Sequence, residues 1–318
     1  MTDKQAIVEL LNADLRDEHA AIVQYLQHAY AIGEGEEAGE IEAIAREEMR
    51  HFDWLAEAIV ELGGKPDMDR GEVDLTGSGP VEWMARDILA EERAIAQYKA
   101  HIAAVEDERI QRLLRRILSD EESHRNDFAD LADELAEEGA QALGTLESRS
   151  PAEAPSGVVD ILQTGVQHEY TVILQYLYHN FVMPQCEVGR ELEMQAINEM
   201  QHLGWLAEEL AEMGGHPLIE HTEMTLDGTP EEMLQADIDA ERAVTTVYSR
   251  QLHEIDDEEL HTLVSRIRDH EIYHEEVFSD LLAEVEETTE AEEAPAVEAD
   301  EPSAPRHEFT VGSLMDRD

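Results

Sequence analysis

Glutamate and histidine residues recur three positions apart along this sequence, a spacing that bears directly on chemistry. Four such Glu-x-x-His pairs stand out: Glu48/His51, Glu121/His124, Glu199/His202 and Glu271/His274. Residues three apart are neighbours on a helix surface, so each pair presents a carboxylate and an imidazole side by side. Both groups ligate divalent metals, and the pattern therefore predicts metal sites built on helices.

The pairs lie within an internal repeat, which strengthens this prediction. Gln24-Tyr25-Leu26 recurs 151 residues later as Gln175-Tyr176-Leu177, and Trp54-Leu55-Ala56-Glu57 recurs at the same offset as Trp205-Leu206-Ala207-Glu208. We interpret the chain as a duplication of a unit of roughly 140 residues.

A fifth pair, Glu258/His261, lacks this support. Its counterpart in the first copy is Glu108 and Gln111, which brings no imidazole. Chance pairs are expected in a chain with 76 acidic residues. We therefore expect Glu258 and His261 to be exposed and to bind no metal.

Two further glutamates in each copy complete a ligand set. The predicted ligands are Glu18, Glu48, His51, Glu91, Glu121 and His124 in the first copy and Glu169, Glu199, His202, Glu241, Glu271 and His274 in the second. Four glutamates and two histidines match the ligand template of dimetal carboxylate bundles. Four carboxylates inside a bundle repel one another, whereas two divalent cations cancel their charge. Carboxylate-rich ligation favours iron, two ions per bundle, with manganese as the alternative.

Start and stop signals divide each copy into four helices. In the first copy, helices are expected to end near Ile32, at Gly63-Gly64 and near Glu138, and Pro80 opens the third. Thr229 and Pro230 open the third helix of the second copy. Short, long and short connections predict hairpins joined by a crossover. The expected fold class is all-α, with two tandem four-helix ferritin-like bundles and a disordered acidic C-terminal tail.

Composition sets the expected boundaries. We predict a first bundle at residues 1–140, a linker at 141–156, a second bundle at 157–288, a disordered Glu/Ala/Pro linker at 289–308 and a terminal peptide at 309–318.

The charge of the chain excludes several classes of partner. With 76 acidic and 22 basic residues, the net charge is −54, so neither nucleic acid nor an anionic membrane is an expected partner. The composition resembles that of halophilic proteins, whose repulsion is screened because the Debye length is about 3 Å in molar salt. The single Cys186 excludes a disulfide framework and a four-cysteine iron site. Without a long apolar run or a secretory signal, a cytoplasmic location is expected.

Two tyrosines are candidate catalytic residues. Tyr25 and Tyr176 lie seven residues after Glu18 and Glu169, at nearly the same angular position two turns along the helix. They could hydrogen-bond near the metals or quench radicals. A core tyrosine without such a role is the alternative.

Several motifs resemble those of bacterioferritins and rubrerythrins. They are Glu18-x5-Gln24-Tyr25, Glu48-Met49-Arg50-His51, Asp87-x3-Glu91 and Asp120-Glu121-Glu122-x-His124. The resemblance covers both repeats and implies oxidation of Fe(II) by dioxygen or peroxide at these ligands. Met49 and Met200 match the position where bacterioferritins bind haem, but methionine is common there without haem, so haem is not expected.

The resemblance also implies that the two sites differ. In related bundles, an acid just before each motif glutamate accepts a hydrogen bond from a ligand histidine on the opposite helix. The first copy has Glu47 and Asp120 at these positions, and the second has Asn198 and His270. Such partners orient the ring and raise its basicity, so we hypothesise that the second site is weaker.

The C-terminus carries a second resemblance. Thr310-Val311-Gly312-Ser313-Leu314 is similar to the targeting peptide of cargo proteins packaged inside encapsulin nanocompartments. It implies an encapsulin shell protein as partner through Thr310, Val311, Gly312, Ser313 and Leu314.

Together these patterns predict a ferroxidase that stores iron as encapsulin cargo. Two alternatives stay open: a peroxide-scavenging enzyme of the rubrerythrin or manganese-catalase type, and a non-catalytic iron-binding cargo. Homo-oligomerisation also stays open.

Overall fold

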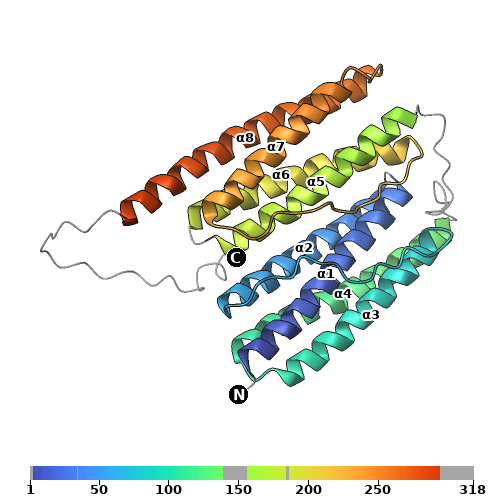
Figure 1. Cartoon of the computed structure of the whole chain (residues 1–318). Helices are drawn as coiled ribbons and strands as arrows, with labels where there is room; N and C mark the ends of the chain where they lie inside the picture. The colour runs from blue at the N-terminus through green and yellow to red at the C-terminus, as the bar shows by residue number, and fades with distance from the viewer. Residues whose placement is uncertain (1–2, 34, 139–155, 184–185, 294–318) are drawn as a thin grey trace, which may run out of the picture.

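A computed structural model describes residues 3–33, 35–138, 156–183 and 186–293, and within these ranges it contains eight α-helices and no strand (Figure 1). The helices are α1 (Lys4–Ile32), α2 (Glu36–Glu61), α3 (Pro80–Ala104), α4 (Glu108–Glu138), α5 (Ser156–Val182), α6 (Cys186–Glu212), α7 (Pro230–Gln251) and α8 (Glu258–Glu293). The tandem all-α architecture is therefore confirmed. Residues 141–155 of the predicted linker and the terminal motif at 310–314 lie outside the described residues, whereas Ser156 is the first residue of α5.

Each half is a four-helix bundle made of two hairpins. Helix α1 packs on α2 and α3 on α4, and α5–α8 repeat this arrangement. Gly63 and Gly214 adopt φ angles of 84° and 76° after α2 and α6, the left-handed conformation that ends helices. A long connection then crosses the bundle to Pro80 or Pro230, as predicted (Figure 1).

Two helix boundaries show how local sequence sets the fold. At the start of α7, the Thr229 side chain accepts from the Glu232 N–H while Glu232 caps the Thr229 N–H, a complete capping box. At the other end of the second bundle, α8 continues to Glu293, so residues 289–293 of the predicted linker are helical.

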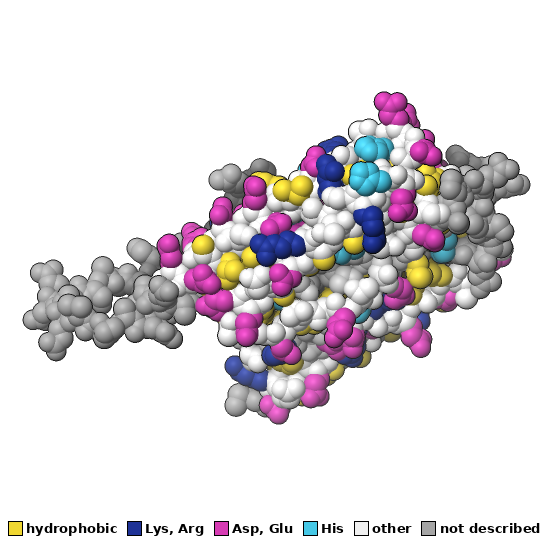
Figure 2. All heavy atoms as spheres, turned by 45° about the horizontal axis from the view of Figure 1, so that its top comes forward, with side chains coloured by type: hydrophobic (Ala, Val, Ile, Leu, Met, Phe, Trp, Pro, Cys, Tyr) yellow, Lys and Arg dark blue, Asp and Glu magenta, His cyan; other side chains and the backbone are white. Residues whose placement is uncertain are grey.

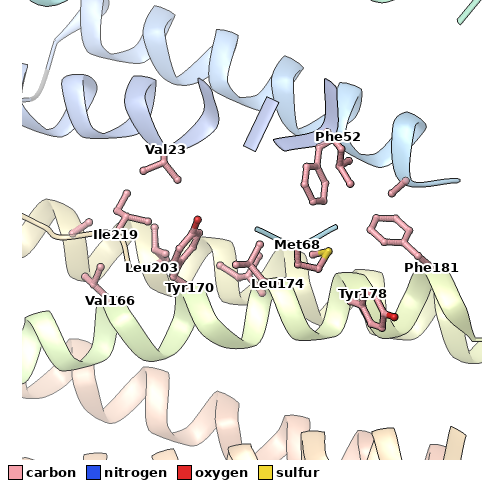
Figure 3. Packing of buried hydrophobic residues seen from close by; sticks show 14 of the residues in the cluster. Val23, Phe52, Met68, Val166, Tyr170, Leu174, Tyr178, Phe181, Leu203 and Ile219 are labelled. Atoms are coloured by element: carbon pink, nitrogen blue, oxygen red, sulfur yellow. The ribbon is translucent and has the colours of Figure 1, made fainter. Parts of the chain in front are cut away.

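The two bundles share one apolar interface. Helices α1 and α2 face α6 and α5, and a continuous buried cluster that includes Val23, Phe52, Tyr170 and Leu203 joins them (Figure 3). His19 hydrogen-bonds Tyr170 across this interface. Burial of this apolar surface fixes the bundles against each other.

The excess of acidic residues in the composition is visible on the protein surface. Carboxylates are spread over the face shown in Figure 2, with few lysines or arginines among them. None of the helices within the described ranges is long and apolar enough to cross a membrane.

Candidate metal centres

The structure brings the twelve predicted ligands into two buried clusters, one per bundle. In the first, α1 contributes Glu18, α2 contributes Glu48 and His51, and α3 contributes Glu91. Helix α4 completes the cluster with Glu121 and His124, and all six residues are at most 3% exposed. Every helix thus directs at least one ligand inward, which the three-residue spacing makes possible on a single face.

Within the first cluster, two overlapping groups of ligand atoms define a pair of positions. One group contains His51 and Glu18, the other His124 and Glu91, and both contain Glu48 and Glu121. The ligand atoms of each group lie within 4.8 Å of one another. Because Glu48 and Glu121 belong to both groups, their two oxygens can bridge neighbouring ions.

The second bundle repeats this arrangement residue for residue. Its two groups are Glu169, Glu199, His202 and Glu271, and Glu199, Glu241, Glu271 and His274. The shared carboxylates are Glu199 and Glu271. By contrast, Glu258 and His261 are both exposed and belong to neither group, as predicted.

The polar atoms at the centre of each cluster fit a pair of cations. Glu48 Oε1, Glu91 Oε2, Glu121 Oε1 and His124 Nδ1 make no hydrogen bond within the described structure. His124 Nδ1 even lies 2.8 Å from Glu48 Oε1 without forming one. Buried polar atoms without partners cost about 1–3 kcal/mol each, and ions bound between them would remove that cost. The donor set suits iron or manganese.

Electrostatics shows what holds the cluster together without metal. Burial raises the pKa of Glu18 to about 8, and the nearby charge of Glu48 adds to the shift. Burial likewise raises the pKa of Glu121 well above its ordinary value. Burial opposes protonation of His51, but its contacts with the carboxylates of Glu121, Glu18 and Glu48 outweigh this and raise its pKa well above the ordinary range. Protons therefore partly take the place of cations, and metal binding must release them.

The first cluster has acidic partners behind both histidines, as the sequence predicted. His124 Nε2 lies 3.0 Å from Glu47 Oε2. His51 Nε2 lies 3.4 Å from Asp120 Oδ2. In both rings the other nitrogen, Nδ1, faces the ligand carboxylates. Each ring is thus held between a ligand position and a carboxylate on the opposite helix of the α2/α4 pair.

The second cluster lacks these carboxylates. His202 Nε2 lies 2.9 Å from His270 Nδ1, so an imidazole occupies the place of Asp120. Asn198, which replaces Glu47, donates from Nδ2 to Gln195 Oε1 at 3.1 Å. The second bundle therefore has an imidazole and an amide at the two positions where the first bundle has carboxylates.

Tyrosines tie the glutamates of the first and third helices together. Tyr25 OH donates to Glu91 Oε1 at 2.6 Å, and Tyr98 OH donates back to Glu18. Tyr176 and Tyr248 make the same reciprocal bonds to Glu241 and Glu169. The hydrogen-bonding position proposed for Tyr25 and Tyr176 is therefore what the structure shows, and both side chains are fully buried.

Sequence reasoning overlooked Tyr98 and Tyr248. The signal was present, because each lies seven residues after a ligand glutamate, Glu91 or Glu241, just as Tyr25 follows Glu18. A ligand glutamate followed by tyrosine at this spacing therefore marks all four first and third helices.

Other repeated polar residues support the clusters from outside. Buried Asp87 accepts a hydrogen bond from Gln24 Nε2 at 2.8 Å and lies 2.9 Å from His28 Nδ1. These residues lie outside both ligand groups. Met49 and Met200 are half-buried, and Met200 packs against the apolar cluster that joins the bundles.

Comparison with known proteins agrees with the fold. The ferritin-like domain matches residues 8–137 and again 159–288. The chain therefore belongs to the ferritin-like domain family, which it contains twice.

Its relatives include bacterioferritins. That of Desulfovibrio desulfuricans is 28% identical over 159 residues, which are 47% of this chain and 89% of the relative. That of Rhodobacter capsulatus is 31% identical over 126 residues, 37% of this chain and 77% of the relative. Among solved structures, bacterioferritins of D. desulfuricans and Mycobacterium tuberculosis align at 30% and 25% identity, each with a TM-score of 0.40. They cover 43% and 44% of this chain, and 83% and 93% of their own.

Proposed function

We propose that this protein is a ferroxidase in which each bundle binds two Fe(II) ions and oxidises them to Fe(III). The observation that carries the proposal is the pair of overlapping ligand groups, which share Glu48 and Glu121 in one bundle and Glu199 and Glu271 in the other. Carboxylates shared by both groups would hold two Fe(II) ions side by side, so that each ion could supply one of the two electrons that reduce one oxidant molecule. The bacterioferritin relatives support iron as the metal.

The reaction balances with two ions per centre. Two Fe(II) supply two electrons, which with two protons reduce dioxygen to hydrogen peroxide, or hydrogen peroxide to two waters. Glu18 and His51 bind one ion and Glu91 and His124 the other. Tyr25 holds Glu91 in place through its hydrogen bond, and its phenol would give one electron and one proton to quench a radical formed at the centre.

The test is to measure dioxygen uptake and ferric absorbance after anaerobic loading with Fe(II). The variant Glu121→Ala/Glu271→Ala removes one shared carboxylate from each bundle. Its rate of Fe(II) oxidation should fall to that of free Fe(II) in solution. The exposed Asp133→Asn on α4 is the matched control and should react like the wild type. A wild-type rate no faster than free Fe(II) would favour a non-catalytic iron-binding protein instead.

The same preparation separates ferroxidase from peroxide scavenging. A purified protein that contains manganese and releases dioxygen from hydrogen peroxide would be of the manganese-catalase type. Peroxide consumption at many turnovers per iron would indicate a rubrerythrin-type enzyme. The ferroxidase proposal requires stoichiometric Fe(III) instead.

We further propose that the chain is cargo of an encapsulin shell, where ferric product would be stored. The support is the Thr310–Leu314 sequence at the end of a Glu/Ala/Pro-rich segment. A tether of this composition would present alternate apolar side chains to a groove. Deleting residues 309–318 should abolish co-purification with a co-expressed shell protein, whereas deleting residues 296–303 should preserve it. Retention of the first variant in shells would refute the cargo role.

A further inference from the structure

A cleft between α1 and α3 leads from the surface of the first bundle to its ligand cluster. Its volume is about 550 Å³. Exposed Asp17 and Glu72 line its outer part, and Glu18 and Glu121 line its inner end. The inner oxygen Glu121 Oε1, fully buried, makes no hydrogen bond in the described structure. The cleft therefore connects solvent directly with two of the six clustered ligands.

Most of the charged residues that line this cleft are acidic, and Arg93 is the one basic residue of the lining. Gln97 Nε2 donates to Asp14 Oδ1 at 2.9 Å and to Asp17 Oδ2 at 2.8 Å, and so holds the two carboxylates on one wall. His101 Nδ1 lies 2.9 Å from Asp14 Oδ2. Asp17 is exposed, Gln97 half-buried and Asp14 buried. Carboxylates in a cleft with low-dielectric walls focus the field and raise the local concentration of cations.

The second bundle keeps only one of these three acids, because Glu223 corresponds to Glu72. Gly165 stands in place of Asp14 and His168 in place of Asp17. A Cβ on Gly165 would lie 2.8 Å from Leu206 Cδ1, so packing already occupies the space that an aspartate would need.

Apolar side chains also fill this wall of the second bundle. Val244 and Val172, both buried, replace Ala94 and Ala21, and a half-buried valine at position 247 replaces the bridging glutamine. Each alanine-to-valine change adds two methyl groups beside the path from the protein surface to the ligand cluster. Along the route that the first bundle offers to a hydrated cation, the second bundle thus has bulkier side chains and two fewer acids.

We propose that divalent cations enter the first centre through the α1/α3 cleft, guided by Asp17, Glu72 and Asp14, and that the first centre fills before the second. The identity of the cation as Fe(II) rests on the proposed function, whereas the difference in access does not require oxidation. The two centres of one chain then work in sequence: the first oxidises Fe(II) at low supply, and the second is recruited as supply rises.

The experiment measures how fast each centre binds Co(II), a redox-stable probe whose absorbance reports coordination. Full-length chains with Glu271→Ala/His274→Ala retain only the first centre, and chains with Glu121→Ala/His124→Ala retain only the second. Stopped-flow binding should be at least about threefold faster to the first centre. That excess should shrink between 0.1 M and 1 M salt, where the Debye length falls from about 10 to about 3 Å.

A second variant isolates the cleft from the centre. Asp17→Asn keeps the shape and the contact with Gln97 but removes a charge, and it should slow first-centre binding about threefold while the final Co(II) stoichiometry is unchanged. Asp133→Asn, outside the cleft, should leave the rate unaltered.

The outcomes separate the two ideas. Equal rates for the two centres, or Asp17→Asn indistinguishable from Asp133→Asn, would overturn ordered loading. Unequal Co(II) rates without any Fe(II) oxidation would uphold ordered loading and overturn the ferroxidase proposal. Failure of both single-centre chains to bind Co(II) would overturn both.

Discussion

The hydrogen bond between Glu47 and His124 makes the difference between the two centres measurable. Glu47 Oε2 lies 3.0 Å from His124 Nε2, on the far side of the ring from the ligand cluster. Removing a carboxylate partner of a ligand histidine lowers metal affinity about 10- to 100-fold. The Glu47 side chain is 43% exposed, so solvent screens the contact. We therefore expect Glu47→Gln to lower metal affinity by the smaller of these factors, about tenfold or ~1.4 kcal/mol.

The assay is anaerobic calorimetric titration with Fe(II) in chains that keep a single centre. Glu47→Gln should weaken the first centre, and Asn198→Glu, which restores an acid near His274, should strengthen the second by a similar factor. Asp133→Asn controls for the loss of one surface charge. If neither substitution at positions 47 and 198 changes affinity by more than twofold, the partners of the ligand histidines do not set the difference between the centres.

Three further predictions follow from the contacts of Glu18, from its raised pKa and from the net charge of the chain. Tyr98→Phe leaves the buried Glu18 carboxyl without its hydrogen-bond donor, so the free energy of unfolding of the metal-free protein, measured with heat or urea, should fall by about 1–3 kcal/mol. The control Tyr273→Phe, at an exposed side chain, should leave the free energy of unfolding unchanged. Because Glu18 has its pKa raised from 4.5 to about 8, the folded metal-free state holds more protons than the unfolded state. Its melting temperature should therefore fall from pH 5 to pH 8, and the gain on saturation with metal should grow over that range; a flat pH profile would contradict the protonated cluster. Raising the salt concentration from 0.1 M to 1 M should raise the melting temperature, because salt screens the repulsion within a chain of net charge −54. A lower melting temperature at 1 M salt would show that this repulsion does not limit stability.

Much of the fold and the ligand set could be predicted because both repeat. Glycine and proline signals end α2 and open α3 and α7 at the expected residues, since they act through the local backbone. The Glu-x-x-His pairs were separable from the chance pair at Glu258 because only they keep register between copies. The exposure of Glu258 and His261 agrees with that distinction.

What the sequence did not reveal depends on contacts between helices. The bond from Tyr98 to Glu18 joins α3 to α1, and no periodicity within one helix reports which glutamate a tyrosine will meet. The same holds for His19 and Tyr170, equivalent residues of the two copies that bond to each other across the bundle interface. The α1/α3 cleft likewise arises from side chains of both helices and the crossing connection. Predicting such contacts requires knowledge of how the helices pack, in addition to the sequence pattern within each helix.

The central claim, two dimetal centres per chain, is tested most directly by counting bound iron. Anaerobic titration of the full chain with Fe(II) should saturate at about four ions per chain, and at about two in each single-centre variant, as expected for dimetal bundles. Exposure to dioxygen should then convert the bound iron to Fe(III) with a diferric absorption band. Saturation at one ion per bundle, or binding unaffected by loss of Glu121 and Glu271, would contradict the account.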